Sequence, residues 1–272
     1  MGLTIKELEE KAKEMRRLCM KLSYGAGDEG SHIGPALSIM DIMTVLYFDV
    51  MRYRTEEPAW EDRDRFLLSK GHAVLGLYVP LILAGFISEE EGRTFNQRHT
   101  RLAGHPSGKD LDGIEHPAGS LGHGLSVACG MALAGKMEEK NYNVYTLIGD
   151  GESEEGSVWE AVMFAAKYKL DNLVAVVDAN GFQYGSPVDE MMAWKPMVEK
   201  WKSFGWHVID VDGNNIARLK EAFDMERPKG KPTCIVARTV KGCGFSKATG
   251  NNDWHHAKIS RDDLELALRE LG

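Results

Sequence analysis

Two polar side chains that could bind a cation stand at the ends of apolar segments. Asp150 lies in the triplet GDG that closes one segment, and Asn180 ends the triplet DAN that closes the next. Helical periodicity between them predicts a strand–helix–strand unit, whose right-handed crossover makes the two strands parallel. We therefore expect Asp150 and Asn180 to lie on the same rim of the sheet, where open α/β sheets bind ligands.

The chemistry of this rim favours a divalent metal and phosphate. Carboxylate and amide oxygens suit Mg²⁺ or Ca²⁺ and suit copper or zinc poorly. Gly149 and Gly151 allow close approach to the backbone, and a helix beginning near Glu155 directs free N–H groups to the same place. A lone GDG is typical of a turn, but its pairing with a second strand end favours a diphosphate bound through Mg²⁺.

The stretch GDGESEEGSVWEA, with the closing Asn180, resembles the thiamine diphosphate motif of the transketolase family. The resemblance implies a thiamine diphosphate-binding α/β fold, with a central, mostly parallel sheet flanked by helices on both faces. It covers residues 1–272 as a single diphosphate-binding domain. It also implies that Asp150, Asn180 and the backbone carbonyl of Phe182 hold the metal.

Four loops each contribute a histidine that the resemblance assigns to the substrate. They are His32 in SHIGP, His72 in SKGHA, His105 in GHP and His255 in DWHHA, with His256 the alternative if the register slips by one. Imidazoles titrating near neutral pH suit proton transfer, whereas a helix N-terminus keeps His72 neutral. The resemblance implies that these histidines bind donor hydroxyls and move protons.

The loop from 98 to 124 and the helix after GDG hold the remaining residues that the resemblance assigns to the cofactor. Gly119 and Leu121, in the segment GSLG, match the residues that meet the cofactor's two rings. Glu155 and Glu160 match glutamates at the interface between active sites, although for most helical glutamates a solvated face is the commoner role. His123 stands where the family usually has Gln. No histidine pair in this loop has the helical spacing of a zinc site.

Composition bounds the class of protein. The 272 residues are 43% hydrophobic and 27% charged, enough for a large core. A net charge of −8 disfavours a nucleic-acid or anionic membrane surface. The four cysteines lack CxxC spacing and are typical of a reducing compartment, and no apolar run approaches the roughly 18 residues of a membrane span. We expect a cytoplasmic enzyme.

Periodicity and capping signals predict the other elements. Thr4 and Glu7 form a capping box for a first helix, and the last helix is capped similarly at Ser260. The remaining expected elements are helices at 38–48, about 121–138, 191–204 and 215–225, and strands at 65–68, 173–177, 206–211 and 233–239.

The resemblance covers one domain of three. The family's pyrimidine and C-terminal domains are not represented in this sequence, and the carboxylate that activates the cofactor belongs to the pyrimidine domain. The implied protein is the N-terminal subunit of a split transketolase, active only with a C-terminal partner subunit in a hetero-oligomer, by family expectation a heterotetramer. Its reaction would transfer a two-carbon ketol unit between sugar phosphates. A 2-oxoacid dehydrogenase E1 α-subunit or a non-catalytic structural subunit remain alternatives, and SKGHA favours the transketolase.

Overall fold

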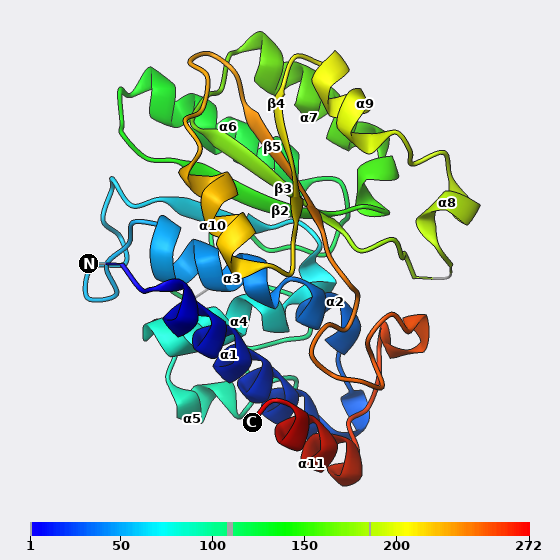
Figure 1. Ribbon diagram of the computed structural model, residues 1–272. Coiled ribbons are helices and arrows are strands. Elements are labelled where there is room, and N and C mark those ends of the chain that lie inside the picture. Colours follow the sequence, from blue (N-terminus) through cyan, green and yellow to red (C-terminus); the bar gives the residue numbers. More distant parts are fainter. Residues whose placement is uncertain (1, 108–110, 185) are drawn as a thin grey trace.

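In the part of the chain that the structure describes, the apolar segments form five parallel strands. The computed structural model describes residues 2–107, 111–184 and 186–272 (Figure 1). The strand order in the sheet is β1-β2-β3-β5-β4, and every neighbouring pair is parallel. The strands are β1 (Arg65–Leu68), β2 (Val144–Gly149), β3 (Leu173–Ala179), β4 (His207–Asp212) and β5 (Thr233–Arg238). The predicted parallel pairing of the strands before GDG and DAN is confirmed, because β2 and β3 are neighbours.

Both faces of the sheet are covered by helices, which explains why β2 and β3 are apolar almost throughout. Every residue of these two strands is buried. Because side chains alternate across a strand, Leu147 and Val176 enter one core, whereas Ile148 and Val177 enter the other. Helices α6, α7 and α9 lie on one side of the sheet in Figure 1, and α1, α3, α4 and α10 lie on the other.

The helices are short apart from α1 and α6. Their bounds are α1 (Ile5–Gly25), α2 (Ile33–Ser38), α3 (Met40–Val45), α4 (Leu75–Ala84), α5 (Glu89–Gly92), α6 (Gly124–Met137), α7 (Gly156–Lys167), α8 (Val188–Met191), α9 (Met197–Ser203), α10 (Ile216–Asp224) and α11 (Arg261–Glu270). Single helical turns cover Gly27–Glu29, Leu46–Val50, Gly71–Ala73, Glu152–Glu154 and Asn252–Trp254.

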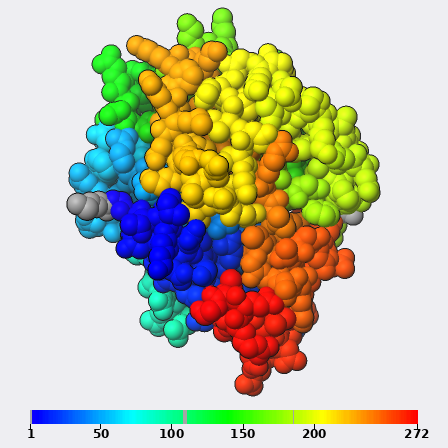
Figure 2. All heavy atoms as spheres, in the orientation of Figure 1, coloured from blue at the N-terminus to red at the C-terminus, as the bar shows by residue number. Residues whose placement is uncertain are grey.

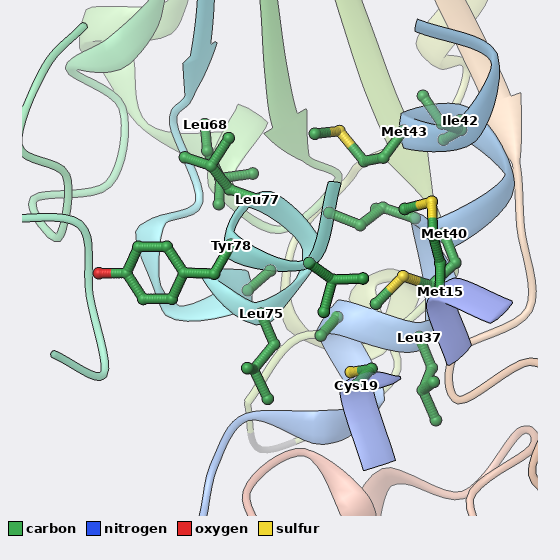
Figure 3. Close-up of a cluster of buried hydrophobic side chains, with 14 of the residues drawn as sticks. Met15, Cys19, Leu37, Met40, Ile42, Met43, Leu68, Leu75, Leu77 and Tyr78 are labelled. Carbon is green, nitrogen blue, oxygen red and sulfur yellow. The ribbon is translucent and has the colours of Figure 1, made fainter. Parts of the chain in front are cut away.

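The first helix begins where the capping box predicts. The Thr4 side chain accepts a hydrogen bond from the Glu7 backbone, and the Glu7 carboxylate accepts one from the Thr4 backbone. The apolar stripe of α1 packs on α3 and α4, where Met15 and Cys19 lie among methionine and leucine side chains (Figure 3). Arg17 donates to the Leu271 carbonyl at 2.9 Å, so α11 lies along α1, as Figure 2 shows in red beside blue.

Three predicted helices differ from the structure. The helix expected at 38–48 is instead α2 and α3, separated at Ile39 and followed by a wider turn at Leu46–Val50. The helix expected at 191–204 is found only as α9, which begins at Met197 after Pro196, because the residue before a proline avoids helical geometry. The helix expected from 121 begins at Gly124, because Gly122 has a φ of +81°.

The described part of the long loop between α5 and α6 has little regular structure, as its composition predicts. Residues 108–110 of that loop lie outside the described residues. In the described part of the chain, no helix is both long enough and apolar enough to cross a membrane.

Candidate functional site

A cavity of about 560 Å³ opens at the carboxyl ends of the central strands. The loops that follow β1, β2, β3 and β5 all contribute to its wall, together with the loops around residues 32, 105 and 120. The lining residues are His32, Pro35, Lys70, His72, His105, Gly119, Leu121, Gly149, Asp150, Gly151, Glu152, Glu154, Glu155, Asn180, Phe182, Gln183, Tyr184, Met192, Lys241 and His255.

Asp150 and Asn180 meet at one end of this cavity. The Asp150 carboxylate, 1% exposed, accepts hydrogen bonds from the backbone N–H groups of Gly151 at 2.9 Å and Gly181 at 2.6 Å. The Asn180 side-chain oxygen accepts from the Phe182 backbone at 3.0 Å. Burial, and then the negative charge of Asp178, raise the pKa of Asp150 to about 7. A divalent metal bound here would supply the positive charge that favours the ionised carboxylate.

The donor set fits magnesium with a phosphate ligand. Within the described residues, no group of three His, Cys, Asp or Glu side chains is arranged to hold a metal ion. Two side-chain oxygens and one carbonyl are instead the partial set that Mg²⁺ completes with water and phosphate oxygens. A side chain on Gly151 would place its Cβ 2.6 Å from the Gln183 Cβ, so the backbone here is packed too closely for any residue but glycine.

A buried ion pair next to Asn180 was missed by sequence reasoning. Asp178 accepts hydrogen bonds from Lys70 at 2.5 Å, from Ser38 at 2.7 Å and from the Asn180 amide at 2.7 Å. Thr239 donates to its other oxygen. Because Asp178 holds the Asn180 nitrogen, the Asn180 oxygen is directed the other way, toward the turn and the expected metal. Lys70 belongs to the motif SKGHA and Asp178 to the motif DAN, and these motifs were the sequence features that could have indicated the pair.

Lys241 is a second buried lysine that the sequence did not single out. Its side chain is 1% exposed, and it donates to the Asn252 side-chain oxygen at 2.6 Å and to His255 Nδ1 at 2.9 Å. Burial, and then the positive charge of Lys70, lower the pKa of Lys241 to about 8. Since an ammonium group can only donate, His255 Nδ1 is the acceptor and the neutral ring carries its proton on Nε2.

The four predicted histidines lie together around His32. Its ring centroid is 5.3 Å from that of His72, 5.7 Å from His105 and 5.4 Å from His255. All four line the cavity. His256 does not line it, but packs edge-on against His32, with the two ring centroids 4.6 Å apart. The structure therefore places His255, rather than His256, in the cavity.

The imidazoles of His32 and His255 do not titrate near neutral pH, whereas His72 was already expected to be neutral. Burial lowers the pKa of His32 to about 4, of His72 to about 2 and of His255 to about 3. Electrostatic repulsion of the protonated ring lowers these pKa values further, from His256 at His32, from Lys70 at His72 and from Lys241 at His255. At neutral pH these rings are neutral, so each can donate one hydrogen bond and accept another.

Comparison with known proteins decides the family. The family model described as "Transketolase, thiamine diphosphate binding domain" matches residues 9–272. The chain belongs to the transketolase family. The predicted thiamine diphosphate-binding α/β fold is thereby confirmed, since transketolase structures are similar to it over its full length. The transketolase from Leishmania mexicana superposes with a TM-score of 0.91 at 28% identity, covering 100% of this chain and 42% of that one.

Relatives of this family include both short subunits and long enzymes. The chain is 40% identical over 270 residues to an apulose-4-phosphate transketolase subunit from Phocaeicola vulgatus, covering 99% of this chain and 95% of the relative. It is 38% identical over 268 residues to human transketolase, covering 98% of this chain but 42% of that enzyme. The chain thus corresponds to nearly the whole of the first and to less than half of the second.

The remaining expected cofactor residues divide between the cavity and the surface. Gly119, Leu121 and Glu155 line the cavity, and Leu121 is 38% exposed at its mouth. Glu160 is exposed on α7 and does not line the cavity. His123 lies outside the cavity, with its Nδ1 3.0 Å from the Leu121 carbonyl oxygen.

Proposed function

We propose that this chain is the diphosphate-binding subunit of a two-chain transketolase that uses thiamine diphosphate and Mg²⁺. The complex would transfer a two-carbon ketol unit between sugar phosphates. The observation that carries the proposal is the meeting, in one cavity, of the oxygen ligands Asp150 and Asn180 with the four imidazoles. Groups suited to a diphosphate and groups suited to a sugar therefore share one site in this family member.

The metal end has the groups that the cofactor needs. Asp150, Asn180 and the Phe182 carbonyl would hold Mg²⁺, and Lys241 would face the anionic diphosphate. Gly119 and Leu121 would contact the cofactor's rings. When bound, thiamine diphosphate supplies the carbanion chemistry, while the protein positions it and moves protons.

The histidines would act on the sugar as neutral hydrogen-bonding groups. His32, His72 and His105 can each donate to one sugar oxygen and accept from another hydroxyl. His255 presents its Nε2 proton, because its Nδ1 accepts from Lys241. That arrangement lets His255 donate a hydrogen bond from Nε2 to a sugar oxygen, while Lys241 fixes the tautomer of the ring.

A partner subunit would complete the site. The relatives named as transketolase subunits and the 42% coverage of human transketolase support a second chain that brings the pyrimidine domain. Another relative, 38% identical over 270 residues, is named 6-deoxy-6-sulfo-D-fructose transketolase subunit SqwG. That name refers to a sulfonated sugar. We therefore assign to this chain the general ketol transfer, with the choice of sugar determined mainly by the partner.

The test is reconstitution. The purified chain, with thiamine diphosphate, Mg²⁺ and sugar phosphates, should show no turnover until the partner subunit is added. Asp150→Ala should abolish the activity of the reconstituted complex, whereas Asp224→Ala, on the exposed end of α10, should leave it unchanged. Turnover by the chain alone would refute the partner requirement, and full activity of Asp150→Ala would refute a catalytic role for this subunit.

A further inference from the structure

Glu152 is a buried carboxylate to which neither the motif nor the comparisons assign a role. Its side chain lies in the single helical turn Glu152–Glu154 that follows GDG, and the residue is 4% exposed. One oxygen accepts hydrogen bonds from the Gly122 backbone N–H at 2.9 Å and from the Ser69 hydroxyl. The other accepts from the Gly149 backbone N–H at 3.0 Å.

These three donors lie in or directly next to three different segments that line the cavity. Ser69 precedes Lys70 and His72 after β1, Gly122 ends the segment that carries Gly119 and Leu121, and Gly149 begins GDG. The three donors come from separate segments of the chain, at positions 69, 122 and 149. A single carboxylate therefore joins the parts of the wall expected to contact the cofactor's rings and its metal.

Both backbone polar groups of Gly122 are hydrogen-bonded. Its N–H donates to Glu152, and its carbonyl accepts from the Ser157 hydroxyl at 3.0 Å. Gly122 has a φ of +81°, and a Cβ there would lie 2.7 Å from the Glu155 Cβ and 2.6 Å from the Ser157 Oγ. The end of the segment 119–122 is thus held in its backbone conformation by contacts to the start of α7, and Glu152 accepts from the Gly122 N–H.

We propose that Glu152 is a positioning residue that holds the 119–122 segment and the GDG turn in the geometry that binds the cofactor. The inference rests on the proposed function, because the ligand is the thiamine diphosphate assigned there. Glu152 does not need to touch that ligand. It acts through the backbone of Gly122 and Gly149, and so it should set the affinity for the cofactor rather than the chemical step.

Glutamine is the decisive replacement because it keeps the size and removes one acceptor. Both Glu152 oxygens accept from backbone N–H groups, which cannot rotate to become acceptors. In Glu152→Gln, the new NH₂ group must therefore face either Gly122 or Gly149 and leave that N–H without a partner. We expect the dissociation constant for thiamine diphosphate with Mg²⁺ to rise at least about tenfold.

Two further variants separate this role from general loss of structure. Ser157→Ala removes the other bond to Gly122 and leaves Gly149 untouched, so it should weaken cofactor binding less than Glu152→Gln does. Glu138→Gln, at the exposed end of α6, makes the same chemical change without these bonds and should bind the cofactor as the wild type does.

The first measurement uses the full chain without cofactor. In ¹H–¹⁵N spectra, Glu152→Gln should shift the Gly122 and Gly149 amide signals and speed their hydrogen exchange, while the amide of Val176 in β3 stays protected. The second measurement is calorimetric titration of the two-chain complex with thiamine diphosphate and Mg²⁺. In kinetic assays of that complex, KM for the cofactor should rise while kcat at saturating cofactor is retained.

The outcomes distinguish this inference from the proposed function. A wild-type complex that binds no thiamine diphosphate would refute the proposed function. A wild-type complex that binds it and a folded Glu152→Gln complex that binds it equally well would refute the positioning role. If Glu152→Gln does not fold, the inference is tested by Ser69→Ala, which removes the side-chain donor to the Glu152 oxygen that binds Gly122. Unchanged affinity together with an unchanged Gly122 amide in that variant would overturn it.

Discussion

Replacing Lys70 with Met should destabilise the fold strongly, because it leaves Asp178 charged and buried. The Lys70 and Asp178 side chains are 2% and 0% exposed, and their charged atoms are 2.5 Å apart. Removing one partner of a buried pair costs about 3–5 kcal/mol. Ser38, Asn180 and Thr239 continue to donate to Asp178, so we expect the lower end of that range, about 3 kcal/mol.

Unfolding of the purified chain measures this cost. Methionine retains most of the volume of the lysine stem, so the loss reflects charge rather than a cavity. At roughly 2–4 °C per kcal/mol for a chain of about this size, the melting temperature should fall by about 6–12 °C. The matched control is Lys195→Met. Lys195 forms an ion pair with Asp189 in which the two side chains are 65% and 47% exposed, so losing this pair should cost less than about 1 kcal/mol.

The double variant Lys70→Met/Asp178→Asn decides whether charge is the cause. Removing the carboxylate's charge should recover much of the stability lost in Lys70→Met, because the asparagine side chain can still accept from Ser38 and Asn180 while donating to Thr239. A Lys70→Met chain that loses less than about 1 kcal/mol, or a double variant whose loss equals the sum of the single losses, would refute the reasoning.

Three other predictions follow from the cavity. In NMR spectra of the imidazoles, His32 and His255 should remain neutral at pH 5. The free energy of unfolding should fall as the pH drops from about 6.5, because the unfolded chain then binds protons that these buried rings exclude. Titration midpoints near pH 6.5 for the two imidazoles would contradict this prediction. Gly151→Ala should weaken cofactor binding through its clash with Gln183, whereas Gly130→Ala, with open space around it on α6, should raise stability by about 0.5–1 kcal/mol in thermal unfolding. Chelation of divalent cations should abolish the complex's activity and Mg²⁺ should restore it; persistent activity in chelator would refute the metal site.

The sheet was predictable from sequence because its signals are local. The strand at 65–68 was placed at its observed bounds, and the apolar runs before GDG and DAN gave a parallel pair. Helix ends were less predictable, since they depend on contacts that the periodicity does not carry. The start of α6 at Gly124 is set by the positive φ of Gly122, which in turn is held by Glu152 and Ser157 from distant parts of the chain.

The site residues also divide into those that local sequence motifs predict and those that depend on distant contacts. Asp150, Asn180 and the four histidines stand in short motifs, and the structure places all of them on one cavity. The buried lysines were harder to recognise, because an isolated lysine in a sequence is usually solvated. The role of Lys70 depends on Asp178, 108 positions away, and that of Lys241 depends on a histidine 14 positions away. Such pairings follow from the folded chain rather than from either motif.

The charges of the cavity favour joint binding of the proposed metal and an anionic cofactor. Lys70 is neutralised by Asp178, whereas Lys241 donates, among the described residues, to the neutral groups Asn252 and His255. The charge of Lys241 therefore faces a wall that also carries Asp150 and glutamates. A diphosphate entering alone would be repelled by these carboxylates, but a divalent cation held by Asp150 would cancel most of the negative charge on both sides. Cofactor and metal should consequently bind together, each weakly without the other.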